Sequence, residues 1–589
     1  MFKIILITTL LHIFVNKSLI NCEDIDLYKK KHPLPRILAD TENCPINACE
    51  AIKVMSQYFL LTKSGQKLRP QDSTPSPTPT TSYLGKIDPF TLEFELQKKV
   101  RQIESRLRAV EQPVWKLTTG SQEEWNHCTA GVCRCNPDTK TFTCWNLNLI
   151  SVPITQVIPM NMVYIDLSRN LLSTLHKDTF RGLTLLLELH LSNNNLDFLP
   201  FDLFRDLDSL VQLRLQSNHL EDIDPRTFWK LRNLNLLDLS KNILRELPEQ
   251  VFNNMQRLRV INLSDNRIKR FPIGLLNDQK QLEELDLSRN EIQFLESGSF
   301  YHQQELKVLD FAENQIYNIK DDVFSNLISL RSLTLHNNRL TVITKELFEY
   351  MENLLSLDLT LNRITRIHGE AFSHLKQLRE LYLGQNTIST ISEGLFLNLE
   401  NLSRLMLFSN NLTSLYSNNF LGLRSLRNLM LNNNILKKFD FDTFQPLIKL
   451  EKLRIDSNKL QYLPQGTLDN LPSLLAVKLD KNPWHCDCRA LYLARWIREH
   501  VTKLWDCQPM CRGPGDLGGN EVGLLRYDDL CDGQWASMLS LSPRLPVRKH
   551  QILNPKNFSD YVQMYNLKYY STLNPQDVES TTPRWLDES

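Results

Sequence analysis

Apolar residues recur along the central part of the chain in the pattern L-x-x-L-x-L-x-x-N-x-L. Its asparagines are spaced by 24 residues without an insertion or deletion: Asn170, Asn194, Asn218, Asn242, Asn266, Asn290, Asn314, Asn338, Asn362, Asn386, Asn410, Asn434, Asn458 and Asn482. Ten residues later stands another apolar side chain: Phe180, Phe204, Phe228, Phe252, Leu276, Phe300, Phe324, Phe348, Phe372, Phe396, Phe420, Phe444 and Leu468. The constant period indicates fourteen structural repeats.

Each repeat predicts one coil of a solenoid, because one repeat alone cannot bury its apolar residues. The L-x-L segment predicts a short strand, and stacked strands predict a parallel sheet on the inner, concave side. The asparagine side chain is expected to satisfy backbone groups of the turn that follows, and the phenylalanines to fill the wider outer side. With strands ~4.8 Å apart, the inner sheet should be roughly 60 Å long. The fold class predicted is an α/β-type solenoid.

Cysteines gather at the two ends of this array, where a solenoid would otherwise expose its core. The front group is Cys128, Cys133, Cys135 and Cys144, and the rear group is Cys486, Cys488, Cys507, Cys511 and Cys531. We expect disulfide-bonded caps, which persist in an oxidising compartment. A zinc site is a less favoured interpretation, since the C-x-C spacings differ from the usual C-x-x-C knuckle.

The two cysteine-rich segments resemble the caps of extracellular leucine-rich-repeat proteins. The residues that carry the resemblance are the front cysteines followed by LISVPITQVIP, and NPWHCDCRALYLARWIREH with the later CRGPGDLGGNEVGLLRYDDLC. The resemblance implies a right-handed horseshoe with disulfide caps at both ends, and the pairs Cys128–Cys135, Cys133–Cys144, Cys486–Cys511 and Cys488–Cys531.

Within those proteins the capped array is similar to the acid-labile subunit of the insulin-like growth factor complex and its insect matrix-associated counterparts. RAVEQPVWKL, before the front cap, adds to this likeness. The resemblance implies binding of a growth factor together with its carrier, or organisation of extracellular matrix.

Composition divides the chain into further segments. The predicted organisation is a signal peptide (1–21), a Cys-containing segment (22–69), a Ser/Thr/Pro linker (70–87), a helix (88–113), the front cap (114–161), the repeats (162–483), the rear cap (484–532) and a polar tail (533–589). Lys3 and the short apolar run after it indicate secretion. No later apolar run approaches the ~18 residues of a spanning helix, so we expect an extracellular protein without a membrane anchor.

The predicted helix carries an apolar stripe. Its members follow a 4-3-4-3 spacing and stop before Pro113: Leu96, Val100, Ile103, Leu107 and Val110. This spacing is typical of a coiled coil, which would make the protein a homodimer. A helix docked against its own front cap is the favoured alternative, because only about two heptads exist.

Overall charge narrows the range of partners. The chain has 68 Lys plus Arg and 67 Asp plus Glu, a formal net charge of +1. This balance excludes a globally basic nucleic-acid binder, so no nucleic-acid partner is expected.

One residue per strand should point into the hollow, because side chains alternate along a strand. In the middle of the array these positions are acidic, at Asp238, Asp286, Asp310 and Asp358. Over repeats four to nine, the outward positions hold seven acidic and two basic residues, a net charge of −5. We interpret this as a site for a basic protein partner. A solvated face is the alternative, and a calcium site is a weaker one.

Beyond the acidic zone the outward positions become aromatic or thioether. Tyr382, Met406 and Met430 follow one another, and Phe408 falls beside Met406. Exposed apolar side chains of this kind usually mark a contact site, so we assign them to partner binding. Self-association and coverage by the amino-terminal segment are the alternatives.

Four N-x-S/T sequences predict N-glycosylation, at Asn262, Asn401, Asn411 and Asn557. Asn262 occupies an outward strand position, so a glycan on it would stand within the hollow.

No catalytic motif was found: the chain has no HExxH, phosphate-binding glycine loop or nucleophile elbow. We therefore expect no enzyme activity, no cofactor and no resident metal. The function predicted is a secreted scaffold that recognises an extracellular protein ligand through its concave face. A structural or organising component of extracellular (apical) matrix is the alternative, and a receptor ectodomain is less favoured.

Overall fold

The computed structural model describes residues 89–531. The predicted signal peptide, Cys-containing segment, linker and polar tail lie outside these residues, as do Cys22, Cys44, Cys49 and Asn557.

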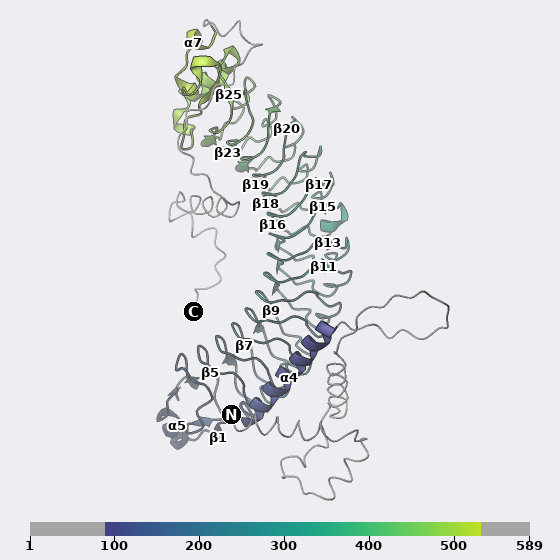
Figure 1. Ribbon diagram of the computed structural model, residues 1–589, viewed down its shortest axis with the longest axis vertical. Helices are drawn as coiled ribbons and strands as arrows, with labels where there is room; N and C mark the ends of the chain where they lie inside the picture. The colour runs from purple at the N-terminus through teal and green to yellow at the C-terminus, as the bar shows by residue number, and fades with distance from the viewer. Residues whose placement is uncertain (1–88, 532–589) are drawn as a thin grey trace, which may run out of the picture. The chain divides into compact units, whose positions relative to one another are not determined.

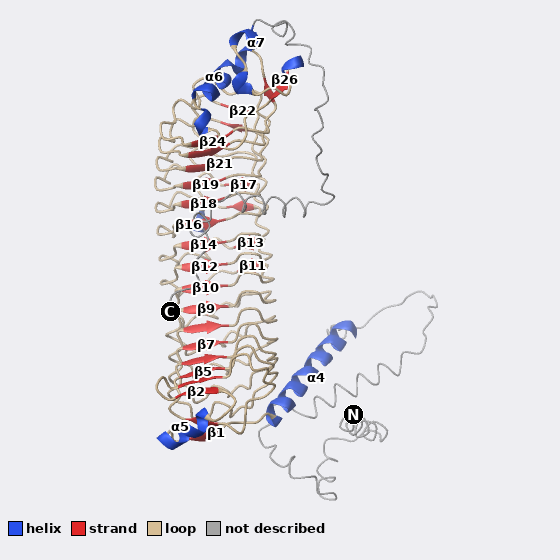
Figure 2. Ribbon diagram, turned by 90° about the vertical axis from the view of Figure 1, so that its left-hand side faces the viewer, coloured by secondary structure: helices blue, strands red, loops and turns tan. Residues whose placement is uncertain are grey.

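A single sheet of sixteen short strands runs through the described part of the chain (Figures 1 and 2). In spatial order the strands are β2 (Arg134–Asn136), β3 (Thr141–Thr143), β5 (Tyr164–Asp166), β6 (Glu188–His190), β7 (Gln212–Arg214), β8 (Leu236–Asp238), β9 (Val260–Asn262), β10 (Glu284–Asp286), β12 (Val308–Asp310), β14 (Ser332–Thr334), β16 (Ser356–Asp358), β18 (Glu380–Tyr382), β19 (Arg404–Met406), β21 (Asn428–Met430), β23 (Lys452–Arg454) and β24 (Ala476–Lys478). All neighbours are parallel except β2 and β3. The sheet lines the inner side of the arc of coils (Figure 1), and the predicted solenoid fold is confirmed.

Alternation along each strand explains which residues form the core. The central residue is buried in every one of the repeat strands, as at Leu213 and Leu309, while the residues on either side face outward. Because the coils stack in register, each buried leucine packs on its counterpart 24 residues away. Burial of a leucine side chain contributes about 2 kcal/mol, so repetition stabilises an array whose single coils would not fold alone.

The asparagines form a ladder that joins successive coils. Asn338, for example, donates its amide to the carbonyls of Phe311 (2.8 Å) and Leu335 (3.2 Å), and its oxygen accepts from the backbone of Ile316 (2.9 Å). The residue before each asparagine adopts the left-handed conformation, with φ of 52° at Asn337 and 56° at Leu361. The pattern predicts the asparagine contacts but gives no sign of this backbone conformation, since residues of many types occupy the position.

Stacked rings fill the outer side of the coils. Phe372, Phe396 and Phe420 are buried, with successive ring centroids 6.5 Å apart and nearly parallel planes. Two-residue strands pair outside them: β11 (Phe294–Leu295) with β13 (Asn318–Ile319), β15 (Val342–Ile343) with β17 (Arg366–Ile367), and β20 (Ser414–Leu415) with β22 (Lys438–Phe439). A 3-10 turn, Glu346–Phe348, completes this side.

Each end of the solenoid is covered by a disulfide-bonded cap. The front cap contains β1 (Lys116–Thr118), α5 (Gln122–Thr129) and β4 (Val157–Pro159). The rear cap contains β25 (Trp484–His485), α6 (Leu491–Glu499), β26 (Cys511–Gly513), α7 (Tyr527–Cys531) and the 3-10 turns Cys488–Ala490, Val501–Lys503, Gly515–Leu517 and Val522–Leu524. The structure pairs Cys128–Cys135, Cys133–Cys144, Cys486–Cys511 and Cys488–Cys531, as the resemblance implies. Cys507 is exposed and has no disulfide partner among residues 89–531.

Helix α4 (Pro89–Glu111) docks differently from the favoured prediction. Its contacts are with the second and third repeats rather than the front cap: Gln102 donates to Asp222, and Ser105 and Arg108 donate to Asp197. The docked face is polar, because the repeats present carboxylates there. The apolar stripe points to solvent, with Val100 45% and Leu107 61% exposed.

Candidate functional site

Except for Phe408, which follows β19 by two residues, the predicted partner-binding residues lie in one row along the concave sheet. Strand register places Asp238 beside Asn262, Asp286 beside Asp310, and Asp358 beside Tyr382. The row continues through Met406 to Met430 and then to Arg454. All except Met430 are half-buried, which is expected of outward residues that touch the neighbouring strands on both sides.

The four aspartates have a local structural role that the sequence interpretation did not include. In each, Oδ1 accepts a hydrogen bond from the backbone two residues later: from Ser240 (3.0 Å), Ser288 (2.9 Å), Ala312 (2.7 Å) and Thr360 (2.8 Å). Asn262 makes the same bond to Ser264 (3.0 Å). An asparagine therefore serves the turn as well as an aspartate does, and the turn alone does not require negative charge.

The surroundings of Asp310 make ionisation of its carboxyl group less favourable. Its burial raises the pKa to about 6, and the carboxylates of Asp286, Asp358 and Glu313 push the pKa in the same direction, while the bond from the Ala312 backbone opposes the rise. Nearby, Arg289 pairs with Glu313 at 3.2 Å. The acidic zone is thus a site in which carboxylates repel one another, and a cationic group placed there would relieve that repulsion.

Tyr382 belongs to a polar network that joins two strands. Its hydroxyl donates to Glu380 (2.8 Å) and accepts from Arg404 (3.1 Å), and Arg404 also pairs with Glu380 at 3.2 Å. Burial raises the pKa of Tyr382 to about 12. The ring is consequently held in place before any partner arrives, so little side-chain entropy would be lost on binding.

The apolar part of the row is smaller than predicted. Met406 and Phe408 are half-buried, and the Phe408 ring folds back over Gly384 of the preceding repeat. Met430 is only 9% exposed, so the expectation that its side chain is exposed is wrong, and its part in partner binding stays a prediction. Its register neighbour is Arg454, whose side chain is itself 11% exposed and forms an ion pair with Asp456. The crowding around Arg454 limits solvent access to this end of the row.

The rear end of the row, at β23 and β24, is basic, and its charges are paired with carboxylates. Arg454 pairs with Asp456 at 2.9 Å, and Lys478 pairs with Asp506 of the rear cap at 2.7 Å. Trp505 of the same cap lies 5.7 Å from the Arg454 guanidinium. Asp456 follows Arg454 by two residues on the same repeat, whereas Asp506 belongs to the rear cap, 28 residues after Lys478.

A second polar network at the front end of the sheet was missed by the sequence interpretation. The rings of Tyr164 and His190 meet edge to face at 5.0 Å, with the tyrosine hydroxyl 3.2 Å from His190 Nδ1. Burial, with the nearby charge of Arg214, lowers the pKa of His190. The alternation of strand residues places His190 among the outward positions, in register with Asp166. Tyr164 occupies the other outward position of its strand, and the repeat pattern does not single it out.

The glycosylation sequences differ in accessibility. Asn411 is exposed, and Asn401 is exposed although its amide also donates to the Lys376 carbonyl at 2.9 Å. Asn262 is half-buried in β9, and its side-chain oxygen accepts from Ser264 Oγ at 2.7 Å. Neighbouring side chains would therefore crowd a glycan attached to Asn262.

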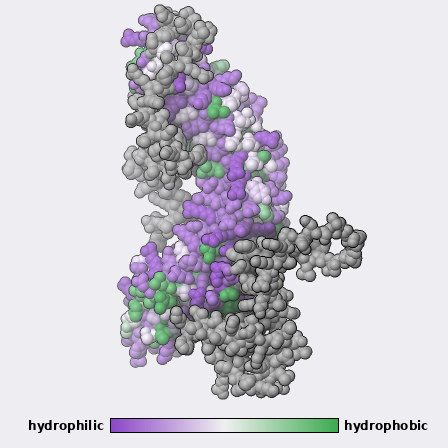
Figure 3. Space-filling model, viewed as in Figure 1, coloured by the Kyte–Doolittle hydropathy of each residue, from purple (hydrophilic) through white to green (hydrophobic). Residues whose placement is uncertain are grey.

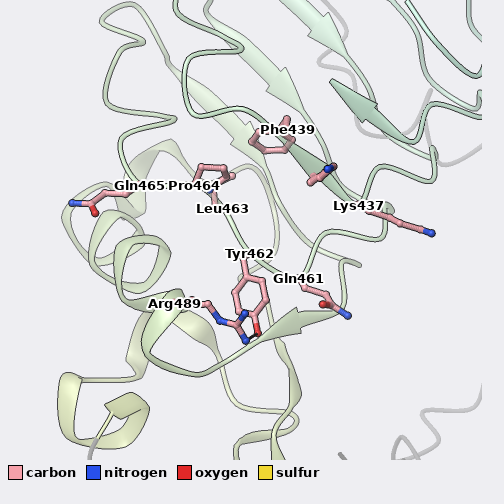
Figure 4. A pocket seen from close by; sticks show the side chains of 9 residues that line it. Lys437, Phe439, Gln461, Tyr462, Leu463, Pro464, Gln465 and Arg489 are labelled. Carbon is pink, nitrogen blue, oxygen red and sulfur yellow. Dashed lines mark hydrogen bonds between the residues drawn. The ribbon is translucent and has the colours of Figure 1, made fainter. Parts of the chain in front are cut away.

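One cavity of about 410 Å³ lies away from the row, beside the rear cap (Figure 4). Lys437, Phe439, Pro464 and Tyr462 line it. Arg489 stacks over Tyr462, 4.0 Å from the ring centroid, and pairs with Asp487 at 2.8 Å. The arginine charge is thus compensated within the cap, while Lys437 and Lys438 also line the cavity.

Elsewhere the face shown in Figure 3 is mainly hydrophilic, with apolar residues in small separate areas. Within residues 89–531 no three His, Cys, Asp or Glu side chains gather as metal ligands. In the same range, no helix combines the length and apolar character that crossing a bilayer requires.

Comparison with known proteins agrees with this architecture. The sequence model described as "Leucine rich repeat" matches residues 160–220, 186–244, 210–268, 280–340, 328–388, 377–436 and 424–483. Human carboxypeptidase N subunit 2 is 39% identical over 49 residues, 8% of this chain and 9% of that protein.

Two solved structures are similar over most of the array. The Toll–Spatzle complex of Drosophila, in its glycosylated form, matches 65% of this chain at 26% identity with a TM-score of 0.58. The TLR13–ssRNA13 complex matches 61% at 26% identity with a TM-score of 0.53. The chain covers 54% and 52% of those two chains, so it spans about half of their length.

Proposed function

Because this chain belongs to the leucine-rich repeat family, whose repeats make up most of its described residues, we propose that it is an extracellular, non-enzymatic scaffold that binds a protein partner through its concave face. The observation that carries the proposal is the register of Asp286 and Asp310, two carboxylates held side by side within an acidic row. Adjacent like charges on a sheet are destabilising, and binding of a basic partner offsets that cost.

The partner has a definable chemistry. Lysine or arginine side chains would meet the aspartates of β8, β10, β12 and β16. An apolar group would meet Met406 of β19 and Phe408, which follows that strand. Electrostatic attraction would speed encounter, and the partly buried apolar contacts would slow dissociation. A growth factor with its carrier, as the resemblance to acid-labile subunits implies, is the specific form of this proposal.

Protein rather than nucleic acid is the favoured ligand. One structural neighbour, TLR13, is solved with single-stranded RNA, whereas the Toll neighbour is solved with Spatzle. Phosphate backbones are bound mainly by lysine and arginine. The row here has a net negative charge in its centre, and its basic end is paired with Asp456 and Asp506.

An organising role in extracellular matrix is the second candidate. The observation that favours it is the apolar stripe of α4, which faces solvent beside the solenoid. A surface of this kind serves assembly rather than capture of a soluble ligand.

Charge reversal in the hollow tests the binding proposal. The variant Asp286→Lys/Asp310→Lys should fold, because Arg214 occupies an equivalent position in the row. The control is Glu296→Lys/Glu305→Lys, which makes the same charge change on exposed residues of the same repeats, outside the row. Wild type and both variants would be used to capture proteins from extracellular fluid, followed by quantitative mass spectrometry and titration of the purified partner.

We expect a basic protein whose affinity falls at least tenfold in the Asp286/Asp310 variant and is unchanged in the control. Raising the salt concentration should weaken binding to the wild type much more than to the variant. Equal recovery of every protein by the two variants would contradict a binding role for the row. Unchanged recovery combined with altered assembly would favour the matrix role.

A further inference from the structure

Helix α4 is attached to the solenoid by its polar side. Ser105 and Ala109 are each 5% exposed, and Ser105 Oγ donates to Asp197 at 2.9 Å. Arg108 adds a second bond to the same carboxylate, and Gln102 reaches Asp222 one repeat further on. These contacts hold the helix in a fixed orientation without using the apolar residues of its exposed stripe.

The opposite side of α4 is apolar and open. The exposed fractions are 45% at Val100, 46% at Ile103, 61% at Leu107 and 72% at Val110. At 100° per residue these positions lie on one stripe, about 180° from Ser105. Docking therefore directs the stripe away from the solenoid, and four exposed aliphatic side chains in three turns are more than a soluble helix usually presents.

The spacing of the stripe fits one kind of partner. Intervals of three, four and three residues are those of the core positions of a two-stranded coiled coil, in which each apolar residue enters a hole on an identical helix. A globular partner would not require this periodicity.

Charged residues beside the stripe favour one relative orientation of the two helices. Lys99 and Arg106 flank it on one side, and Glu104 and Glu111 flank it on the other. In a parallel pair, a residue on the first side faces the residue five positions later on the second helix. Lys99 would then face the partner's Glu104. Arg106, whose guanidinium lies 5.7 Å from the centroid of the Phe198 ring of its own solenoid, would turn to the partner's Glu111. An antiparallel pair would instead place lysine near arginine and glutamate near glutamate.

From these observations we infer that α4 forms a parallel, two-stranded coiled coil with α4 of a second copy of this chain. The stripe is short, and a helix of about two heptads would gain little as an isolated peptide. Here the solenoid already orders the helix, so less entropy is lost on association. Because each solenoid docks on the side opposite the stripe, the two solenoids lie on the two outer sides of the helix pair.

Sedimentation equilibrium of the full chain at micromolar concentration tests the inference. The polypeptide mass is 68.8 kDa, so twice that value, plus any glycan, is expected. Ile103→Lys/Leu107→Lys should weaken association at least tenfold. The control, Leu421→Lys/Ile448→Lys, changes comparably exposed apolar residues of the solenoid and should leave the mass unchanged. A wild type of single-chain mass would overturn the inference, as would a dimer that survives the α4 substitutions.

Exchanging the charges beside the stripe distinguishes a true loss of association from misfolding of the variant. Glu104→Lys/Glu111→Lys and Lys99→Glu/Arg106→Glu should each be monomeric alone and should associate when mixed, which only folded chains can do. No association on mixing would contradict the proposed pairing.

Orientation has its own test. Val100→Cys in a Cys507→Ser background should give a covalent dimer under oxidising conditions, because a parallel pair brings identical residues together. The same background with Val100 retained is the control. An antiparallel pair would place Val100 opposite the partner's Val110, so absence of the covalent species would overturn the parallel arrangement.

Discussion

The ring of Phe408 occupies the space that a side chain at Gly384 would fill. A β-carbon on Gly384 would lie 2.5 Å from Cε1 of that ring. The two positions are equivalent in successive repeats, and most other repeats carry a serine or another small polar residue there, such as Ser240 or Ser264. The glycine is therefore explained by its neighbour 24 residues later rather than by a special backbone conformation.

Gly384→Ser should displace the Phe408 ring into solvent. We expect a loss of the order of 1 kcal/mol in unfolding free energy, because the ring gives up part of its buried area. The check is a double-mutant cycle with Phe408→Ala by chemical denaturation. In the Phe408→Ala background the serine should cost little, and additive effects would contradict the contact.

Asp310→Asn should stabilise the protein at neutral pH. The folded pKa of Asp310 is about 6 against an ordinary value of 3.8, so the folded state holds its proton more tightly. Stability from this group is present at acid pH and is lost as pH rises from about 4 to 6. The gain on substitution at pH 7 is no more than about 3 kcal/mol, since Asn262 shows that an amide supports the same turn.

Thermal melts at pH 4 and pH 7 provide the measurement, and the gain should largely disappear at the lower pH. Asp238→Asn is a matched control, because Asp238 lies between Arg214 and Asn262 rather than beside another aspartate. Equal gains at both pH values would argue against a raised pKa.

Asn338→Asp should weaken the junction between coils. The carboxylate cannot donate to the Phe311 and Leu335 carbonyls, and the site is 5% exposed. A buried, unpaired polar group costs about 1–3 kcal/mol, and a charge costs more. Asn337→Asp is the control, because Asn337 is exposed and Asp265 already adopts the same left-handed conformation. Hydrogen exchange should increase in the coils around Asn338 only, and equal increases in both variants would contradict a ladder role.

Removing the longer rear-cap disulfide should unfold the cap first. Cys488 and Cys531 are 43 residues apart, so Cys488→Ser/Cys531→Ser should lower the free energy of unfolding by about 2–4 kcal/mol. Cys507→Ser should leave the stability of the described fold unchanged, since Cys507 is exposed and has no disulfide partner within residues 89–531. Differential scanning calorimetry distinguishes the two variants, and a shift caused by Cys507→Ser would indicate another role for this thiol.

The sequence pattern was sufficient for the central architecture. The 24-residue period specified the number of coils, and the alternation of strand residues specified that Asp286, Asp310 and Tyr382 share the concave row. Both inferences depend on interactions that repeat locally, so each coil provides the same information as its neighbours. The recurring asparagine, whose side chain can both donate and accept hydrogen bonds, likewise predicted side-chain bonds to the backbone of the turns.

Other features depended on contacts between residues far apart in the chain or between coils whose side chains differ. The sequence predicted the apolar stripe of α4 but not which way it faces. The stripe faces solvent because Asp197 and Asp222 bind the polar side of the helix. Met430 was expected to be exposed, yet it lies beside the largely buried Arg454–Asp456 ion pair. The pKa of Asp310 depends on burial and on carboxylates from neighbouring coils. The periodicity of the sequence determines which way a side chain faces. How tightly that side chain is packed and which charges surround it depend on residues from several coils, and only the folded structure brings those residues together.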